Sequence, residues 1–193
     1  LLNSELGCYL SHYGCVEKFL QTDADYLVVL EDDLRIDNNF SSTLQEILHY
    51  LHSQKNIEWS LINIAAKKNK ISREIFRTHD YSLVRAYYFP IRGVGLVWSR
   101  QGAHDFLKMA QNPCLPVDIF FQNWLIKNGK GLSIWPPLVR PAGLDSDILG
   151  TVATERVRRK QKENRDFSFF MKKQLRLLKN NILAYINFLS FKS

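Results

Sequence analysis

Tyr26-Leu27-Val28-Val29-Leu30-Glu31-Asp32-Asp33 is a run of five apolar residues that leads directly into three carboxylates. An apolar run of this length, rich in β-branched residues, predicts a strand buried on both faces of a sheet. In open α/β sheets, ligands bind at the carboxyl ends of the strands. If the extended chain continues, Glu31 and Asp33 share one face and Asp32 takes the other, so two carboxylates can meet one cation.

The three acids favour a metal site of a particular kind. Carboxylate oxygens are hard ligands, which suit Mg²⁺, Mn²⁺ or Ca²⁺ rather than zinc. A solvated turn or the N-cap of a helix is the alternative interpretation of an acidic run after a strand. The stretch alone leaves both interpretations open.

The composition is that of an ordinary globular protein. The chain has 193 residues, of which 46% are hydrophobic and 23% are charged, enough for one sizeable core. No run approaches the ~20 apolar residues of a membrane span. Cys8, Cys15 and Cys114 are an odd number without metal-ligand spacing, which fits buried thiols in a reducing compartment better than a disulfide framework.

Charge is distributed unevenly along the chain. The formal net charge is +7, and residues 151–193 contain 11 Lys and Arg against 3 Asp and Glu. Residues 1–150 are therefore close to neutral and are followed by a basic tail. We expect one α/β domain over 1–150 and a separate basic segment over 151–193.

Helical and extended patterns alternate along residues 1–150. Apolar spacings of three or four, with Ser4, Ser42 and Ser99 as N-caps, predict helices over 4–21, 42–51, 99–110 and 117–128. Short apolar runs predict strands over 26–30, 60–64, 83–89, 94–98 and 132–135, and polar residues predict a loop over 67–80. The alternation favours an α/β fold with a largely parallel sheet.

A basic amphipathic helix is predicted from Met171 onward. Its apolar side chains fall on one helical face: Met171, Leu175, Leu178, Ile182, Ile186 and Leu189. The basic side chains lie off that face: Lys172, Lys173, Arg176 and Lys179. Contact with an anionic membrane and docking on its own domain are both open, and the local basic excess favours the membrane. No nucleic-acid motif accompanies the charge, so we expect no nucleic-acid partner.

Several blocks in order resemble glycosyltransferase family 25. They are Gly7-Cys8-Tyr9-Leu10-Ser11-His12, the acidic triplet 31–33, the glycine-containing block 93–103, Pro116-Val117-Asp118 and Ser146-Asp147-Ile148. The resemblance covers roughly residues 4–148. That family comprises lipooligosaccharide glycosyltransferases of Gram-negative bacteria and relatives that glycosylate collagen.

The resemblance implies a GT-A fold, which is a Rossmann-type α/β/α sandwich. It also implies a UDP-hexose donor, most often UDP-galactose, inversion at the anomeric carbon, and a divalent metal, usually Mn²⁺, with Mg²⁺ as the alternative. By that match Glu31 and Asp33 hold the metal and Asp32 contacts the donor. Because Glu stands where the family pattern has Asp, Asp33 is the firmer ligand of the two.

Further site residues follow from the same blocks. Asp118 is the expected general base for the acceptor hydroxyl, with Asp145 and Asp147 as rivals; its other interpretation is an acid that complements a helix dipole. Two more groups complete the expected donor site, each with a structural alternative as a core or turn residue: Ser11 and His12 near the phosphates or the metal, and Gly93 and Gly95 near the sugar.

The leading hypothesis is a metal-dependent glycosyltransferase that acts on a lipid-linked oligosaccharide at the cytoplasmic face of a Gram-negative inner membrane. A non-catalytic carbohydrate- or membrane-binding remnant of such an enzyme is one alternative. A metal-dependent phosphatase or nuclease is less favoured, because the other predicted strand ends supply no acids. Family members carry a further strand and helix before the Gly7-Cys8 block, so we expect an N-terminally incomplete domain with weak or no UDP-sugar binding.

Overall fold

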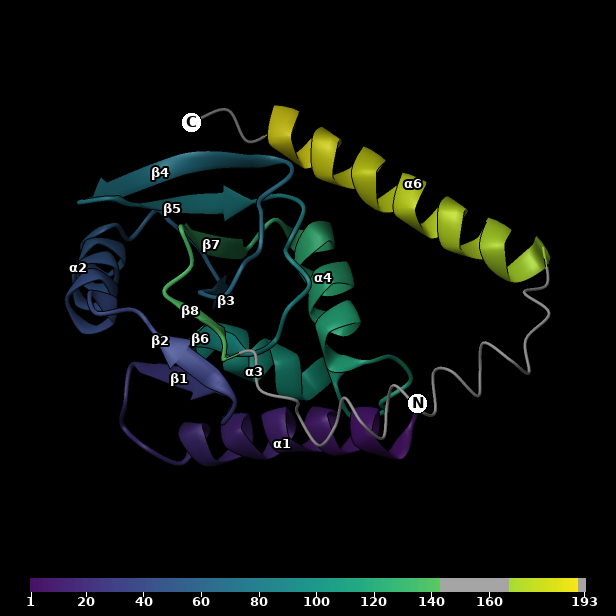
Figure 1. Cartoon of the computed structure of the whole chain (residues 1–193), viewed down its shortest axis with the longest axis horizontal. Coiled ribbons are helices and arrows are strands. Elements are labelled where there is room, and N and C mark those ends of the chain that lie inside the picture. The colour runs from purple at the N-terminus through teal and green to yellow at the C-terminus, as the bar shows by residue number, and fades with distance from the viewer. Residues whose placement is uncertain (143–166, 191–193) are drawn as a thin grey trace.

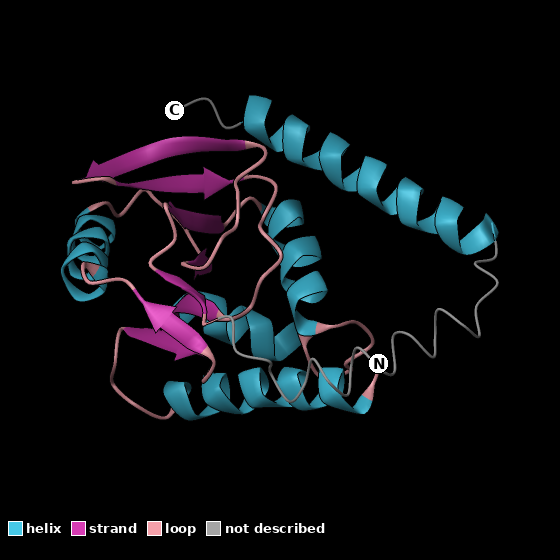
Figure 2. Cartoon of the chain, in the orientation of Figure 1, coloured by secondary structure: helices cyan, strands magenta, loops and turns pink. Residues whose placement is uncertain are grey.

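The computed structural model describes residues 1–142 and 167–190 (Figure 1). The helices are α1 (Asn3–Leu20), α2 (Phe40–Ser53), α3 (Arg100–Met109), α4 (Val117–Asn128) and α6 (Phe167–Ser190). The strands are β1 (Tyr26–Leu30), β2 (Leu34–Ile36), β3 (Leu61–Asn63), β4 (Ser72–Thr78), β5 (Tyr81–Ala86), β6 (Gly95–Ser99), β7 (Gly131–Trp135) and β8 (Val139–Pro141). Figure 2 shows the mixture of helices and strands that makes this an α/β fold.

The main sheet has six strands in the order β1-β6-β3-β7-β5-β4, and β2 pairs with β8 in a separate ribbon. Only β3 and β7 pair in parallel; the other four pairings of the sheet are antiparallel. The expectation of a largely parallel sheet is therefore wrong. Part of the reason is the β4–β5 hairpin, whose two-residue turn contains His79 at a φ of 48°.

Helices cover both faces of the sheet, which confirms the α/β/α sandwich. On one face α1, α3 and α4 bury a core that includes Trp98, Phe106 and Phe121, all fully buried. On the other face α2 and the β2–β8 ribbon pack over Ile62, Val97 and further aliphatic residues. Alternate residues of one strand serve the two cores, as the period of two requires.

Strand β1 lies at the edge of the sheet and is less buried than predicted. Leu27 and Val29 pack against the core beneath α1, but Val28 is 38% exposed and Leu30 is 36% exposed. The prediction that this strand is buried on both faces is wrong, because helix α2 does not cover the second face at this edge. The predicted strand boundaries, 26–30, are confirmed.

The helix caps were only partly predictable. Ser99 caps α3 as expected, and its Oγ accepts a hydrogen bond of 3.0 Å from the amide of Gly102. Ser4 is not a cap: α1 begins one residue earlier, and the amide of Leu2 donates to the Glu5 carboxylate at 2.9 Å. Ser42 is not a cap either, since α2 begins at Phe40.

Helix α6 docks on the body through its amide side chains. Asn180 donates to the side chain of Asn123 at 3.0 Å, Asn187 donates to the carbonyl of Ile126 at 2.7 Å, and Ala184 is fully buried. Leu183 and Phe188 also pack against the body, around Tyr87. Seven other large apolar residues face away from it and are 40–57% exposed: Met171, Leu175, Leu178, Ile182, Tyr185, Ile186 and Leu189. None of the described helices is both long and apolar enough to cross a membrane.

Candidate functional site at the end of strand β1

Glu31 extends the pairing of β1 by one residue and points toward α1. Its amide donates to the carbonyl of Val94 at 3.0 Å, which continues the ladder between β1 and β6. Side chains two residues apart share a face of a strand. Glu31 therefore follows Leu27 and Val29 onto the face that α1, α3 and α4 cover.

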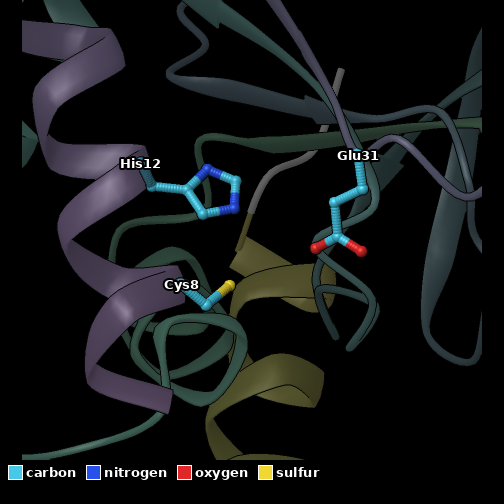
Figure 3. A group of neighbouring side chains, drawn as sticks. All are labelled: Cys8, His12 and Glu31. Carbon is cyan, nitrogen blue, oxygen red and sulfur yellow. The ribbon is translucent and has the colours of Figure 1, made fainter. Parts of the chain in front are cut away.

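Helix α1 brings two further polar side chains to this point. Cys8 and His12 are four residues apart, so they lie one above the other on one face of the helix. Their sulfur and one ring nitrogen lie within 4.8 Å of each other and of a Glu31 carboxylate oxygen. Figure 3 shows the three side chains pointing toward one another from the helix and from the strand end.

The electrostatics of the site are dominated by carboxylates. Burial raises the pKa of Glu31, and the negative charges of Asp33, Asp32 and Asp118 raise it further. Burial, with smaller contributions from Glu31 and Asp118, raises the pKa of the Cys8 thiol to about 11. Within residues 1–142 and 167–190, Glu31 forms no ion pair with a lysine or arginine. A cation bound here would relieve repulsion among these groups.

His12 is a neutral imidazole in this environment. It is 3% exposed, and burial lowers its pKa to about 4. The ring packs edge-on against Phe121, with 5.6 Å between the ring centroids, and its buried Nδ1 has no hydrogen-bond partner among the described residues. Gly93 lies beside the ring, where an added Cβ would be 3.6 Å from Nε2. The structure thus brings His12 and Gly93 to the same place as Glu31.

Asp118 lies in the first turn of α4, and its charge acts on the site. One of its carboxylate oxygens accepts a hydrogen bond of 2.8 Å from the amide of Ile119. Its charge acts on both Cys8 and Glu31, so the expected base and the first residue of the acidic triplet share one electrostatic environment. Its rivals Asp145 and Asp147 lie outside the described residues.

The rest of the acidic triplet follows a bend rather than an extended strand. Asp32 is exposed and Asp33 is half-buried, and the chain turns there before β2 begins at Leu34. The carbonyl of Asp33 accepts a hydrogen bond of 2.8 Å from the amide of Ala142. The extended conformation on which the expected alternation depends ends at Glu31, although Glu31 and Asp33 are both half-buried and Asp32 between them is exposed.

Two of the expected site residues, Ser11 and Gly95, make local contacts apart from the cluster around Glu31. Ser11 is on the exposed face of α1, where its hydroxyl donates to the carbonyl of Gly7 at 3.0 Å. Gly95 lies in β6, where an added Cβ would clash with a methyl of Val139 and would be 3.0 Å from Ile64. Close packing against the second core accounts for Gly95, and its Cβ position faces away from the cluster around Glu31.

The sequence reasoning missed Cys8 as a member of the site. Compared only with one another, the three cysteines predict buried thiols. Cys15 and Cys114 are exposed, so that expectation is wrong for these two. The available signal was the spacing between Cys8 and His12, because four residues is one helical turn.

Comparison with known proteins identifies relatives over the first two thirds of the chain. The sequence profile of "Glycosyltransferase family 25 (LPS biosynthesis protein)" matches residues 1–121. Procollagen galactosyltransferase 1 of Danio rerio is 36% identical over 124 residues, which is 62% of this chain and 20% of the relative. Procollagen galactosyltransferase 2 of Homo sapiens is 31% identical over 124 residues, 62% of this chain and 19% of the relative.

A third relative has a name of a different kind. "Probable inactive glycosyltransferase 25 family member 3" of Bos taurus is 32% identical over 123 residues, 62% of this chain and 20% of the relative. The chain thus spans about a fifth of the length of the curated relatives it matches.

Proposed function

Because the chain belongs to glycosyltransferase family 25, we propose that it transfers a hexose, galactose first, from a UDP-sugar to a saccharide acceptor. The observation that carries the proposal is the approach of His12 to Glu31 where β1 ends beneath α1, with the charge of Asp118 on α4 also acting on Glu31. A nucleoside diphosphate carries negative charge, which a site with this excess of carboxylates does not attract unaided. A divalent cation bound between the carboxylates and the diphosphate would compensate the negative charge of both.

The residues at the bend fit such a cation. Asp33 contributes the largest of the neighbouring charges that raise the pKa of Glu31, so the two acids act on one another around the bend. Oxygen donors of this kind suit Mn²⁺ or Mg²⁺, and Asp33 and Glu31 would hold the ion. When bound, it stabilises the negative charge that develops on the departing diphosphate. Exposed Asp32 contacts the donor beside it.

Asp118 is proposed as the general base that takes the proton of the acceptor hydroxyl. A general base must lie close to the reacting hydroxyl, and the first turn of α4 holds this carboxylate near enough for its charge to act on Glu31. The experiment for this role is Asp118→Asn. We expect loss of transfer with UDP-sugar binding retained, and equal loss of both would assign Asp118 to binding instead.

The test of the main proposal is donor hydrolysis with UDP-galactose and UDP-glucose, with and without Mn²⁺. We expect Mn²⁺-dependent release of UDP that Asp33→Asn abolishes. Asp25→Asn is the matched control, because Asp25 is an exposed aspartate at the opposite end of the same strand. Equal rates for Asp33→Asn and Asp25→Asn would refute the metal assignment.

A non-catalytic role is the second candidate. It is favoured by the bovine relative whose name calls it probably inactive. In that case the chain binds a saccharide or UDP-sugar without turnover. Calorimetric binding of UDP-galactose with no UDP release, in the presence of Mn²⁺, would support this candidate over the enzyme.

The acceptor is proposed to be a lipid-linked oligosaccharide at the cytoplasmic face of a Gram-negative inner membrane. The family description names LPS biosynthesis, whereas the curated relatives include procollagen galactosyltransferases, so both acceptor classes belong in the assay. Transfer to a procollagen peptide and not to lipooligosaccharide would overturn this part of the proposal.

The exposed apolar side of α6 supports contact with an anionic membrane. Seven of its large apolar residues face away from the body, and Lys173, Arg176 and Lys179 on the same helix are exposed. Basic residues beside an apolar stripe bind anionic lipid. We expect Leu178→Glu to abolish binding to phosphatidylserine vesicles, while Asn181→Glu, which adds the same charge outside the stripe, weakens it slightly. If both variants weakened vesicle binding equally, the contact would be electrostatic only, without insertion of the apolar stripe.

A further inference from the structure

The cluster at the end of β1 contains a donor set that shares only Glu31 with the proposed donor-metal site. Cys8, His12 and Glu31 offer one sulfur, one nitrogen and one oxygen, and these three atoms all lie within 4.8 Å of one another (Figure 3). Two of the residues come from adjacent turns of α1, which is a rigid element, and the third follows β1 directly.

The chemistry of this set differs from that of a carboxylate site. Thiolate and imidazole ligands select borderline and soft ions such as Zn²⁺ over Mg²⁺ or Ca²⁺. Zinc sites with three protein ligands leave a fourth position open, and a single carboxylate is common among the three. The donor set therefore fits Zn²⁺ and its analogue Co²⁺.

The distances permit closure around one ion. Metal–ligand bonds of about 2.0–2.3 Å place the ligands of a tetrahedral zinc roughly 3.4–3.8 Å apart. The three atoms would thus move together by about 1 Å from the upper limit of their present separations. The Glu31 side chain makes no ion pair within the described part of the chain, so its carboxylate is available to move.

His12 supplies the second, independent indication of a ligand. The side chain is 97% buried, it points into the cluster, and Nδ1 has no hydrogen-bond partner among the described residues. Gly93 leaves the space beside Nε2 open, because any side chain there would begin 3.6 Å from that atom. A neutral imidazole carries its proton on one ring nitrogen, so the nitrogen that faces Cys8 and Glu31 can offer its lone pair to a metal ion while Nδ1 carries the proton.

We propose that Cys8, His12 and Glu31 form a binding site for Zn²⁺ or a similar borderline transition-metal ion, distinct from the Asp33 site. On binding, the Cys8 thiol loses its proton to solvent and the sulfur bonds to the metal. The imidazole donates a lone pair and Glu31 donates a carboxylate oxygen, while water takes the open position. Where the proposed function holds, the ion also competes for Glu31; the site itself does not depend on that function.

The experiment is a titration of the metal-free full chain with Co²⁺. A cobalt–thiolate bond gives a sulfur-to-metal charge-transfer absorption in the near ultraviolet that oxygen and nitrogen ligands do not give. We expect this band to saturate at one ion per chain and to disappear when Zn²⁺ is added. Absence of the band in the wild-type chain would overturn the proposal.

Variants identify the ligands. Cys8→Ser should lose the band, while Cys15→Ser, an exposed cysteine on the same helix, should keep it. Glu31→Gln should weaken Co²⁺ binding about tenfold or more. A band that survives Cys8→Ser, or that Cys15→Ser removes, would place the thiolate elsewhere and refute the site.

Two controls keep the result independent of folding and of the proposed enzyme. Asp33→Asn should keep the band even where it abolishes Mn²⁺-dependent hydrolysis, so failure of one site is distinguishable from failure of the other. If Cys8→Ser does not fold, alkylation of the wild-type chain replaces it. Zn²⁺ should then protect Cys8 and leave exposed Cys15 and Cys114 reactive, and equal labelling with and without Zn²⁺ would refute the proposal.

Discussion

Acidification should destabilise the fold through His12. The folded chain keeps this imidazole neutral by burying it, with a pKa of about 4 against the ordinary value of 6.5. As the pH falls, the unfolded chain therefore takes up a proton on His12 before the folded chain does. The stabilising contribution is complete above about pH 6.5 and is lost progressively as the pH falls toward 4.

The magnitude follows from the size of the pKa difference. Each pKa unit corresponds to about 1.4 kcal/mol, so full titration of His12 removes roughly 3 kcal/mol of unfolding free energy. Between about pH 7.5 and pH 5 the loss is about 2 kcal/mol. Glu31 acts in the opposite direction, because its raised pKa means that the folded chain takes up a proton there more readily.

The assay is urea unfolding across this pH range in the presence of a chelator, for the wild type and for His12→Gln. The glutamine variant is less stable overall, since it loses the ring contact with Phe121, but it lacks the imidazole. Subtracting its pH profile from that of the wild type isolates His12 from Glu31. Parallel profiles would refute the reasoning, and would mean that an ionised Glu31 holds His12 as an imidazolium in the fold.

Three further predictions concern packing. Gly102→Ala should destabilise the fold by about 2 kcal/mol or more in urea unfolding, because the new Cβ would be too close to the carbonyl oxygen of Ser60. Gly7→Ala is the matched control: its new Cβ meets nothing within 4 Å, so it should stabilise α1 by about 0.8 kcal/mol. Phe106→Ala should cost about 3–5 kcal/mol, since the ring is fully buried, and a cost under 1 kcal/mol would contradict its central place in the core. Asn187→Ala should cost about 1 kcal/mol and speed amide exchange in α6, and unchanged exchange would show that apolar packing alone docks the helix.

The α/β class and most element boundaries followed from the sequence, because apolar periodicity records which face of an element is buried. Apolar periodicity does not record whether a strand runs parallel to its neighbour or whether it lies at the edge of the sheet. Strand β4 was predicted as a loop because it is the far edge of the sheet, and its residues, Ser72-Arg73-Glu74-Ile75-Phe76-Arg77-Thr78, are mostly polar. Strands β2 and β8 are three residues each, too short for a period to be visible.

The part of the candidate site that continues the regular alternation of a strand was predictable from the sequence. The part that lies on a bend was not. Glu31 keeps the alternation of β1, so its face could be inferred from Leu27 and Val29. The bend at Asp32 and Asp33 depends on pairing between β2 and β8, which are distant in sequence. No local pattern encodes that pairing, so the relative placement of the three acids required the structure.

The choice of glutamate at position 31 separates the two proposed metal sites. Its side chain is one methylene longer than aspartate, a difference of about 1.5 Å, and that reach brings its carboxylate to Cys8 and His12 on α1. We therefore expect Glu31→Asp to weaken the Co²⁺–thiolate band while Mn²⁺-dependent donor hydrolysis, held chiefly by Asp33, is retained. Absorption and UDP release measured on the same preparation test both expectations. If the shorter side chain left the band intact and abolished hydrolysis, Glu31 would serve the donor metal alone, and its approach to α1 would be a consequence of packing.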